Sequence, residues 1–444
     1  FYGDISAFPF EQNRTGNFEV LFDVSDVDLD YQPGWPLLKA LSARVHFHGN
    51  QLEIAAPDGR VFDSRTRHVT AHIPSLKPVS SIAIKGHIKG PLKDTLKTLQ
   101  SEALSRRFGK FAAALQANGE STLELDFALP LTATGRPRLQ GVLQFENAGL
   151  VLPEWAFAMS EINGQLGFDL DGIQAKAIEA KAMNSRVRLD VRPLAGGSTR
   201  ITANATLGAK DIADQLPTLP LHFAQGEAAF RIDLDIPSGT GSNDGPASLS
   251  VESPLQGIAI ALPAPLGKTA LDPRAFSIRL PLASTSQSAR LAYGDDVSAT
   301  FSPDGSRVDI MLGGAQTTRQ ETPGVRISGN VATLDPTAWQ TAIASLGLQS
   351  DAQLPPTDVD LLIGRLDLPA YPVDEVSVTL RQREGVWRGR LAATQLSGEF
   401  TIPASLSQQP VDVELDRLLV TLPISDDSTP PAPAPDPATA INPT

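Results

Sequence analysis

Apolar and polar residues alternate along much of the chain, and this period of two is the clearest pattern in the sequence. The runs that show it best span residues 18–24, 123–129, 186–192, 230–236, 358–363 and 411–416. Successive side chains of a strand point to opposite faces, so each run predicts a strand with one apolar and one charged face. This alternation is typical of antiparallel sheets and not of buried parallel sheets.

Turn dipeptides between the apolar runs predict hairpins joined in a meander. They are Gly49-Asn50, Asp58-Gly59, Asp171-Gly172, Gly196-Gly197 and Asp304-Gly305. Helices are predicted only at residues 92–117, 211–216 and 336–346. The last has Asp335 as N-cap, Pro336 at the first helical position and Gly347 as its stop.

A weak repeat of about 110–125 residues runs through the sequence. Strand pairs at residues 16–35 and 141–155 both end at a tryptophan, and residues 249–262 have the same strand-turn-strand form. We expect one continuous repetitive region over residues 1–425, with approximate units 1–140, 141–245 and 246–425. Residues 426–444 are rich in Pro and Ala and predict a flexible tail.

Composition excludes several classes of function. The net charge is −13 and the sequence has no basic stripe with interleaved aromatics, which argues against nucleic acid as a partner. The absence of cysteine removes thiolate catalysis, disulfides and Cys-based zinc sites. The sequence contains no apolar run long enough to span a bilayer and no signal peptide. We therefore expect a middle portion of a longer protein whose anchoring segment lies outside it.

A sheet with one apolar face must cover that face, and the predicted helices are too few to do so. The strands could pack as a sandwich of two sheets, close into a barrel, or curl into a trough that a ligand fills. An uncovered apolar surface of this kind marks a binding site. Composition and periodicity leave the three alternatives open.

Two stretches carry a resemblance to a known family. Residues 8–41 (FPFEQNRTGNFEVLFDVSDVDLDYQPGWPLLKAL) and residues 253–268 (SPLQGIAIALPAPLGK) resemble the large AsmA-like proteins of Gram-negative bacteria, of the YhdP type. The segments GHIKGPLKDTL at residues 86–96 and GVRISGNVATLDPTAWQ at residues 324–340 follow in the matching order. The resemblance covers the chain up to about residue 422.

The resemblance implies a mostly β fold, an elongated twisted antiparallel sheet curled into a hydrophobic groove with few short helices. It implies transport of phospholipids between the inner and outer membranes, with acyl chains carried along the groove in support of the outer-membrane permeability barrier. It further implies a periplasmic location within a protein anchored in the inner membrane, with no catalytic residues, no cofactor and no metal. Contact with the two membranes would be made by regions outside this sequence.

The candidate groove-lining residues follow from the alternation alone, and a register error of one residue would invert each strand's assignment. They are Phe18, Val20, Phe22, Leu125, Phe127, Leu166, Phe168, Leu189, Phe230, Ile232, Leu234, Ile260, Ile278, Leu280, Ile310, Leu361 and Val413.

Other residue groups suggest sites more weakly. A metal site at His46, His48, His68 and His72 lacks a carboxylate partner at suitable spacing. The aspartates of residues 23–30 lack the Gly-x-Glu pattern of a calcium loop. The four tryptophans are better read as packing residues than as sugar platforms. Two alternative functions stay open, a structural or adhesive β-sandwich array without lipid and a carbohydrate-active β enzyme.

Overall fold

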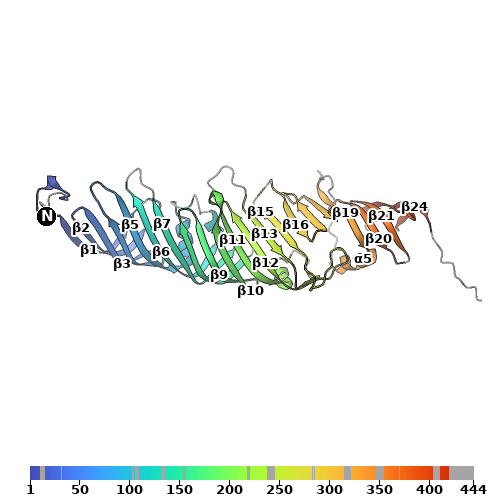
Figure 1. The fold of residues 1–444 in the computed structure, drawn as a ribbon, viewed down its shortest axis with the longest axis horizontal. Coiled ribbons are helices and arrows are strands. Elements are labelled where there is room, and N and C mark those ends of the chain that lie inside the picture. The colour runs from blue at the N-terminus through green and yellow to red at the C-terminus, as the bar shows by residue number, and fades with distance from the viewer. Residues whose placement is uncertain are drawn as a thin grey trace, which may run out of the picture.

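The described strands form one long open sheet, elongated and twisted along its length (Figure 1). The computed structural model describes residues 1–10, 16–31, 33–102, 105, 110–131, 137–153, 157–217, 221–237, 246–282, 284, 286–314, 322–345, 355–369, 371–403 and 411–419. The expected mostly β fold is confirmed. The tail predicted over residues 426–444 lies outside the described residues, and the three predicted units stay predictions.

The N-terminal half of the sheet is a meander of long strands. They are β1 (Glu19–Leu29), β2 (Leu38–His48), β3 (Gln51–Val61), β4 (Ser64–Ile73), β5 (Ser81–Pro91), β6 (Gln116–Pro130), β7 (Arg138–Leu152), β8 (Phe157–Asp169), β9 (Ile173–Ala182), β10 (Ser185–Pro193), β11 (Thr199–Gly208) and β12 (Ala224–Ile236). Each pairs antiparallel with the next along the chain, as the alternation predicted.

The C-terminal half is mixed. Its strands are β13 (Ser248–Ser253), β14 (Ile258–Ile260), β15 (Phe276–Pro281), β16 (Ala289–Tyr293), β17 (Val297–Phe301), β18 (Arg307–Leu312), β19 (Gly324–Leu334), β20 (Thr357–Asp367), β21 (Pro372–Arg383), β22 (Val386–Ala392), β23 (Leu396–Ile402) and β24 (Asp412–Leu418). β13 pairs with β15, while the short β14 pairs with the start of β12. The pairings β18–β19 and β19–β20 are parallel, a feature that the alternation did not predict.

The helices are short and gather at one long edge of the sheet. They are α1 (Leu92–Leu99), α3 (Lys110–Ala113), α4 (Ala209–Gln215) and α5 (Pro336–Ser345), with 3-10 turns η1 (Ile5–Ala7) and η4 (Ala195–Gly197). α1, α4 and α5 follow β5, β11 and β19, which the pairings orient in the same direction, so the three helices start at the same edge. Figure 1 shows α5 at the lower edge of the sheet.

Two of the three helix predictions are confirmed. α4 matches the prediction at 211–216, and α5 begins at Pro336 with Asp335 as its N-cap. The Asp335 Oδ1 atom accepts hydrogen bonds from the backbone N–H groups of Thr337 and Ala338, at 2.9 and 3.0 Å. Gly347, the predicted stop, lies outside the described residues.

The helix predicted over residues 92–117 is wrong at its C-terminal end. α1 ends at Leu99, and Gln116 already begins β6, where it pairs with Val151 of β7. The backbone hydrogen bonds of this long hairpin override the local helical spacing of apolar residues.

The predicted turn at Asp58-Gly59 is also wrong, whereas the other four turn dipeptides connect strands as expected. Asp58 and Gly59 lie inside β3, and the hairpin turns at Phe62-Asp63 instead. A Cβ atom at Gly59 would lie 2.9 Å from the Thr66 hydroxyl and 3.0 Å from Leu41. The glycine therefore serves close packing across the sheet and not a turn.

Buried side chains form local clusters instead of one continuous core. In one cluster Leu92 of α1 packs with Leu143, Ile162 and Ile178 of the sheet. A second cluster joins α4, the start of β12 and residues 254–275. Stability therefore comes from patches where a helix or loop lies on the sheet, together with the ladder of backbone hydrogen bonds.

Replacing Gly141 by alanine tests the packing of an aromatic ring on a strand glycine. Gly141 pairs with Phe168, whose ring occupies the space that a Cβ atom would need. Overpacking of this kind costs about 1–3 kcal/mol, so we expect G141A to lower the free energy of unfolding by that amount in urea titrations. The control G167A, on the opposite face of β8, meets only ordinary contacts with Gln174 at 3.6 Å. Equal stability of the two variants would contradict this packing.

Candidate functional site

Cross-strand pairing joins the apolar side chains of separate strands into continuous rows. One such row crosses eleven strands through residues that lie directly opposite one another. It runs through Leu189, Ala203, Ile232, Val251, Ile278, Leu291, Ala299, Ile310, Ile327, Val359 and Leu380. In the N-terminal half a second row runs through Phe22, Val45, Ile54, Ala71, Ile84, Phe127 and Leu139. We call the surface formed by these rows the apolar face.

β-Bulges keep the apolar residues on this face where the register changes. From Ala175 to Ile178 the strand β9 advances three residues, whereas its partner β10 covers only two, between Val191 and Leu189. The extra residue, Ala177, adopts a positive φ of 56°. Its N–H group donates to the Asp190 carboxylate at 3.0 Å. The bulge thus shifts the register by one residue without moving Ile178 to the other face.

The same arrangement recurs at two other bulges. Asn147, with φ of 50°, donates its N–H to the Asn163 side-chain oxygen at 2.9 Å. Ala40, with φ of 48°, donates its N–H to Asp28 at 3.3 Å. At each site an Asp or Asn side chain of the neighbouring strand accepts the bulge residue's N–H. The sequence placed Asp28 and Asp190 on charged strand faces and did not indicate that they accept these hydrogen bonds.

The structure places the candidate residues as follows. Phe18 immediately precedes β1, and all the others except Ile260 lie in strands of the main ladder. By their pairing they share the apolar face. Ile260 lies in β14, which belongs to residues 254–275 and packs against that face.

Among the residues that the structure describes, no second layer of protein covers much of the apolar face. Most candidate side chains are half-buried, and Val20, Phe22 and Val413 are 40%, 43% and 60% exposed. All 24 described strands belong to the one sheet, so the described residues supply no second sheet to cover it. The sandwich alternative requires such a sheet. The long apolar surface is therefore the principal candidate site.

The opposite face is polar, and ion pairs join neighbouring strands across it. Arg44 contacts Asp23 at 2.8 Å, and Arg200 contacts Asp235 at 2.6 Å. The Arg44 guanidinium lowers the pKa of the Asp23 carboxyl by donating a hydrogen bond to it. Ion pairs that remain in contact with water contribute little to stability, so these pairs keep the face hydrated more than they stabilise it.

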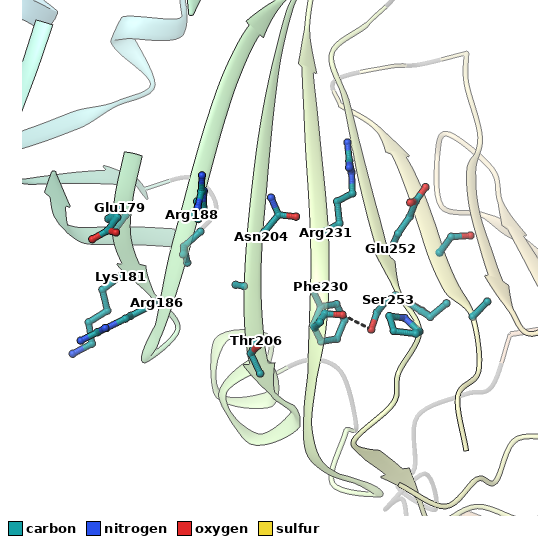
Figure 2. Close-up of a pocket in the computed structure, with 18 of the residues that line it drawn as sticks. Glu179, Lys181, Arg186, Arg188, Asn204, Thr206, Phe230, Arg231, Glu252 and Ser253 are labelled. Carbon is teal, nitrogen blue, oxygen red and sulfur yellow. Dashed lines mark hydrogen bonds between the residues drawn. The ribbon is translucent and has the colours of Figure 1, made fainter. Parts of the chain in front are cut away.

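A hollow of about 1100 Å³ lies on this polar face, over β8 to β16. Figure 2 shows Arg188, Asn204, Arg231 and Glu252 in one row across neighbouring strands of the hollow. Glutamates and basic side chains both line it, so it offers no single sign of charge to a ligand. The hollow lies on the opposite side of the sheet from the apolar face.

A family model described as YhdP protein matches residues 1–442. The chain belongs to the YhdP family. The resemblance inferred from the sequence is thereby confirmed.

A curated relative of this YhdP-family chain is the "Intermembrane phospholipid transporter YhdP" of Escherichia coli (strain K12). The two are 23% identical over 282 residues, which is 63% of this chain and 22% of the relative. The aligned part therefore spans about a fifth of the relative's length. No solved structure matches the chain. No described helix of the YhdP-family chain is long and apolar enough to cross a membrane.

The weaker sequence candidates lie on the polar face or in loops of the YhdP-family chain. His46 contacts Glu19 at 3.1 Å, and His72 lies 3.8 Å from Glu53. Within the described ranges, no three His, Asp or Glu side chains converge to hold a metal ion. Trp35 lies 6.4 Å from Tyr31 by ring centroids, and Trp155 lies outside the described residues.

Sequence reasoning missed the residues that hold segment 254–275 on the apolar face. Tyr293 and Trp339 donate side-chain hydrogen bonds to backbone carbonyls of this segment. The LPAPLGK motif marked the segment as unusual, but nothing in the alternation showed what it contacts.

Replacing Asp190 by alanine tests the bulge arrangement. The variant leaves the Ala177 N–H without its acceptor, and an unpaired, partly buried donor costs about 1–3 kcal/mol. We expect a loss of that size in the free energy of unfolding measured with urea. The control D190N keeps a side-chain oxygen at the same place and should retain most of the stability. Equal destabilisation by both changes would show that the charge matters and not the accepted hydrogen bond.

Proposed function

We propose that this chain carries the acyl chains of phospholipids along its apolar face, as one stretch of a conduit between the inner and outer membranes. The observation that carries the proposal is the continuous apolar row that no second sheet covers. The curated relative's name supplies the cargo class, since it describes an intermembrane phospholipid transporter.

The dimensions of the sheet suit a conduit. With strands about 4.8 Å apart, 24 strands give a contour of roughly 110 Å across the sheet. Rows of apolar side chains run in this same direction, because each row follows the pairing from strand to strand. A hydrocarbon chain lying along a row would keep apolar contact over many strands.

The energetics favour passive movement. Bringing a phospholipid's roughly 30 methylenes into water costs about 24 kcal/mol, at ~0.8 kcal/mol for each group. A continuous apolar face removes most of this cost and requires no catalytic group. In this proposal the headgroup stays in water, and the direction and energy of transport come from other components.

The setting of this function is part of the proposal. The stretch would lie in the periplasm as part of a protein anchored in the inner membrane, and it would support the lipid balance and permeability barrier of the outer membrane. Contacts with the two membranes would be made by regions beyond the described residues.

A pair of adjacent leucines in β20 tests the proposal. Leu361 lies on the apolar face and pairs with Val378, whereas Leu362 lies on the polar face and is 59% exposed. A charge placed against hydrocarbon is strongly unfavourable, so we expect L361D to reduce bound phospholipid at least about fivefold. The L362D variant should bind as the unmodified chain does. Native mass spectrometry after incubation with phosphatidylethanolamine vesicles measures the bound lipid.

Circular dichroism checks that both variants fold. A second pair in β1 repeats the test with a more exposed apolar-face residue, using F22D on the apolar face and L21D on the polar face. If the unmodified chain binds no lipid, or if L361D and F22D bind as well as their controls, the proposed function is wrong.

A further inference from the structure

Residues 254–275 connect β13 to β15, and their buried side chains pack against the apolar face near the start of β12. We call this segment the strap. Within it β14 pairs antiparallel with the start of β12, through Ile260 opposite Ala224 and Ile258 opposite Gly226. Gly226 has a positive φ of 100°, and a Cβ atom there would collide with the strap backbone at Gly257. This glycine allows the two backbones to approach closely where β14 pairs with β12.

The strap buries one row of the apolar face. Its residues Leu255 and Ile258 are themselves buried, and they pack in one cluster with Phe230, Tyr293 and Val297 of the sheet. These three sheet residues are each 8% exposed. Burial also raises the pKa of the Tyr293 hydroxyl, although the neighbouring Arg274 acts in the opposite direction.

The two rows farther from the strap are less buried, although Ile232, Val251 and Leu291 of the first row pack against the cluster that contains the strap. One contains Ile232, Val251, Ile278 and Leu291, and the other contains Leu234, Leu249 and Leu280. All of these side chains are half-buried, in contrast to Tyr293 and Val297. Residues two positions apart in a strand lie about 7 Å apart, so the two open rows run side by side at about that distance.

A lysine fastens the strap to itself. The Lys268 ammonium donates to the backbone carbonyls of Leu255, Ile258 and Thr269, at 2.8 Å for the first and the last. An ammonium has three protons, so these three acceptors satisfy it completely. The interaction ties the end of the strap to its beginning.

Side chains of two other elements fasten the strap to the sheet. The Tyr293 hydroxyl of β16 donates to the Leu266 carbonyl at 2.7 Å, and the Trp339 indole N–H of α5 donates to the Ala264 carbonyl at 3.0 Å. Arg274 lies 4.1 Å from the centre of the Tyr293 ring and contacts Asp296 at 3.0 Å. Attachments at several points indicate a fixed cover.

We propose that the strap confines acyl chains to the two open rows and so sets the width of the conduit over β12 to β18. The inference rests on the proposed function, because it concerns where the lipid lies on the apolar face. Hydrocarbon would contact Leu249, Ile278 and Leu280, and would not contact Tyr293 or Val297. The strap would thus limit how much hydrocarbon can pass abreast at this point.

Photo-crosslinking of the unmodified chain tests this placement. The probe is phosphatidylethanolamine with a diazirine in one acyl chain, presented in phosphatidylethanolamine vesicles, and adducts are located by peptide mass spectrometry. We expect adducts at Leu249, Ile278 and Leu280 at least about fivefold above those at Tyr293 and Val297. Equal yields at the two sets would overturn the role of the strap and leave the proposed function standing. Adducts no more frequent on the apolar face than on the polar face would overturn both.

A second measurement requires no lipid. The sequence has no cysteine, so single-cysteine variants report local access without background. V297C lies in the covered row and V308C in the open row of the neighbouring strand, and both are valine replacements. We expect an apolar maleimide to react at least about tenfold faster with V308C. Equal rates would show that the strap does not cover the row.

Replacing Lys268 by methionine in the V297C background tests the fastening. Methionine keeps the apolar stem and removes the three donors, so we expect the maleimide rate at residue 297 to rise several-fold. Circular dichroism and the unchanged rate of V308C in the same background control for general unfolding. An unchanged rate at residue 297 would overturn the assigned role of Lys268.

Discussion

The ladder of backbone hydrogen bonds is the constraint on which the rest of this structure depends. It fixes which side chains stand opposite one another, and a slip of one residue would move a strand's apolar side chains to the polar face. A single sheet of this length must keep that register through every strand if its apolar face is to be continuous. The bulges at Ala40, Asn147 and Ala177 show how this is achieved, because each absorbs one residue and an Asp or Asn side chain accepts the freed N–H.

The two faces of the sheet have separate physical tasks. Charged side chains on the polar face pair across strands and keep that side in water, but partly exposed pairs contribute little to stability. Apolar side chains on the other face are buried in local clusters, two of which lie against α1 or against α4 and the strap. In the proposed function the remaining apolar surface contacts the acyl chains of the lipid. The stability of the fold and the proposed binding of lipid therefore depend on different parts of the same face.

The sequence alone allowed the prediction of which residues alternate, and it placed Phe22, Leu189 and Ile278 on one face before any pairing was known. This worked because side-chain direction in a strand is a local property. The sequence did not allow the prediction of features that depend on contacts between residues far apart in the chain. The parallel β18–β19–β20 pairing is one, and the extension of β6 into residues predicted as helix is another. The glycine inside β3 likewise reflects contacts with neighbouring strands, at Thr66 and Leu41.

The strap shows most clearly why a local pattern is insufficient. Nothing in the local pattern indicated the role of Lys268, whose ammonium donates to three carbonyls of its own segment. Its presence also bears on how an open sheet would guide a flexible chain. An unbounded apolar face lets hydrocarbon spread across several rows, whereas a fixed cover over one row leaves a defined path along the others. In the proposed conduit, the uncovered rows would let methylenes exchange one apolar contact for another, and the strap would keep them in line over the strands where the sheet changes from antiparallel to mixed.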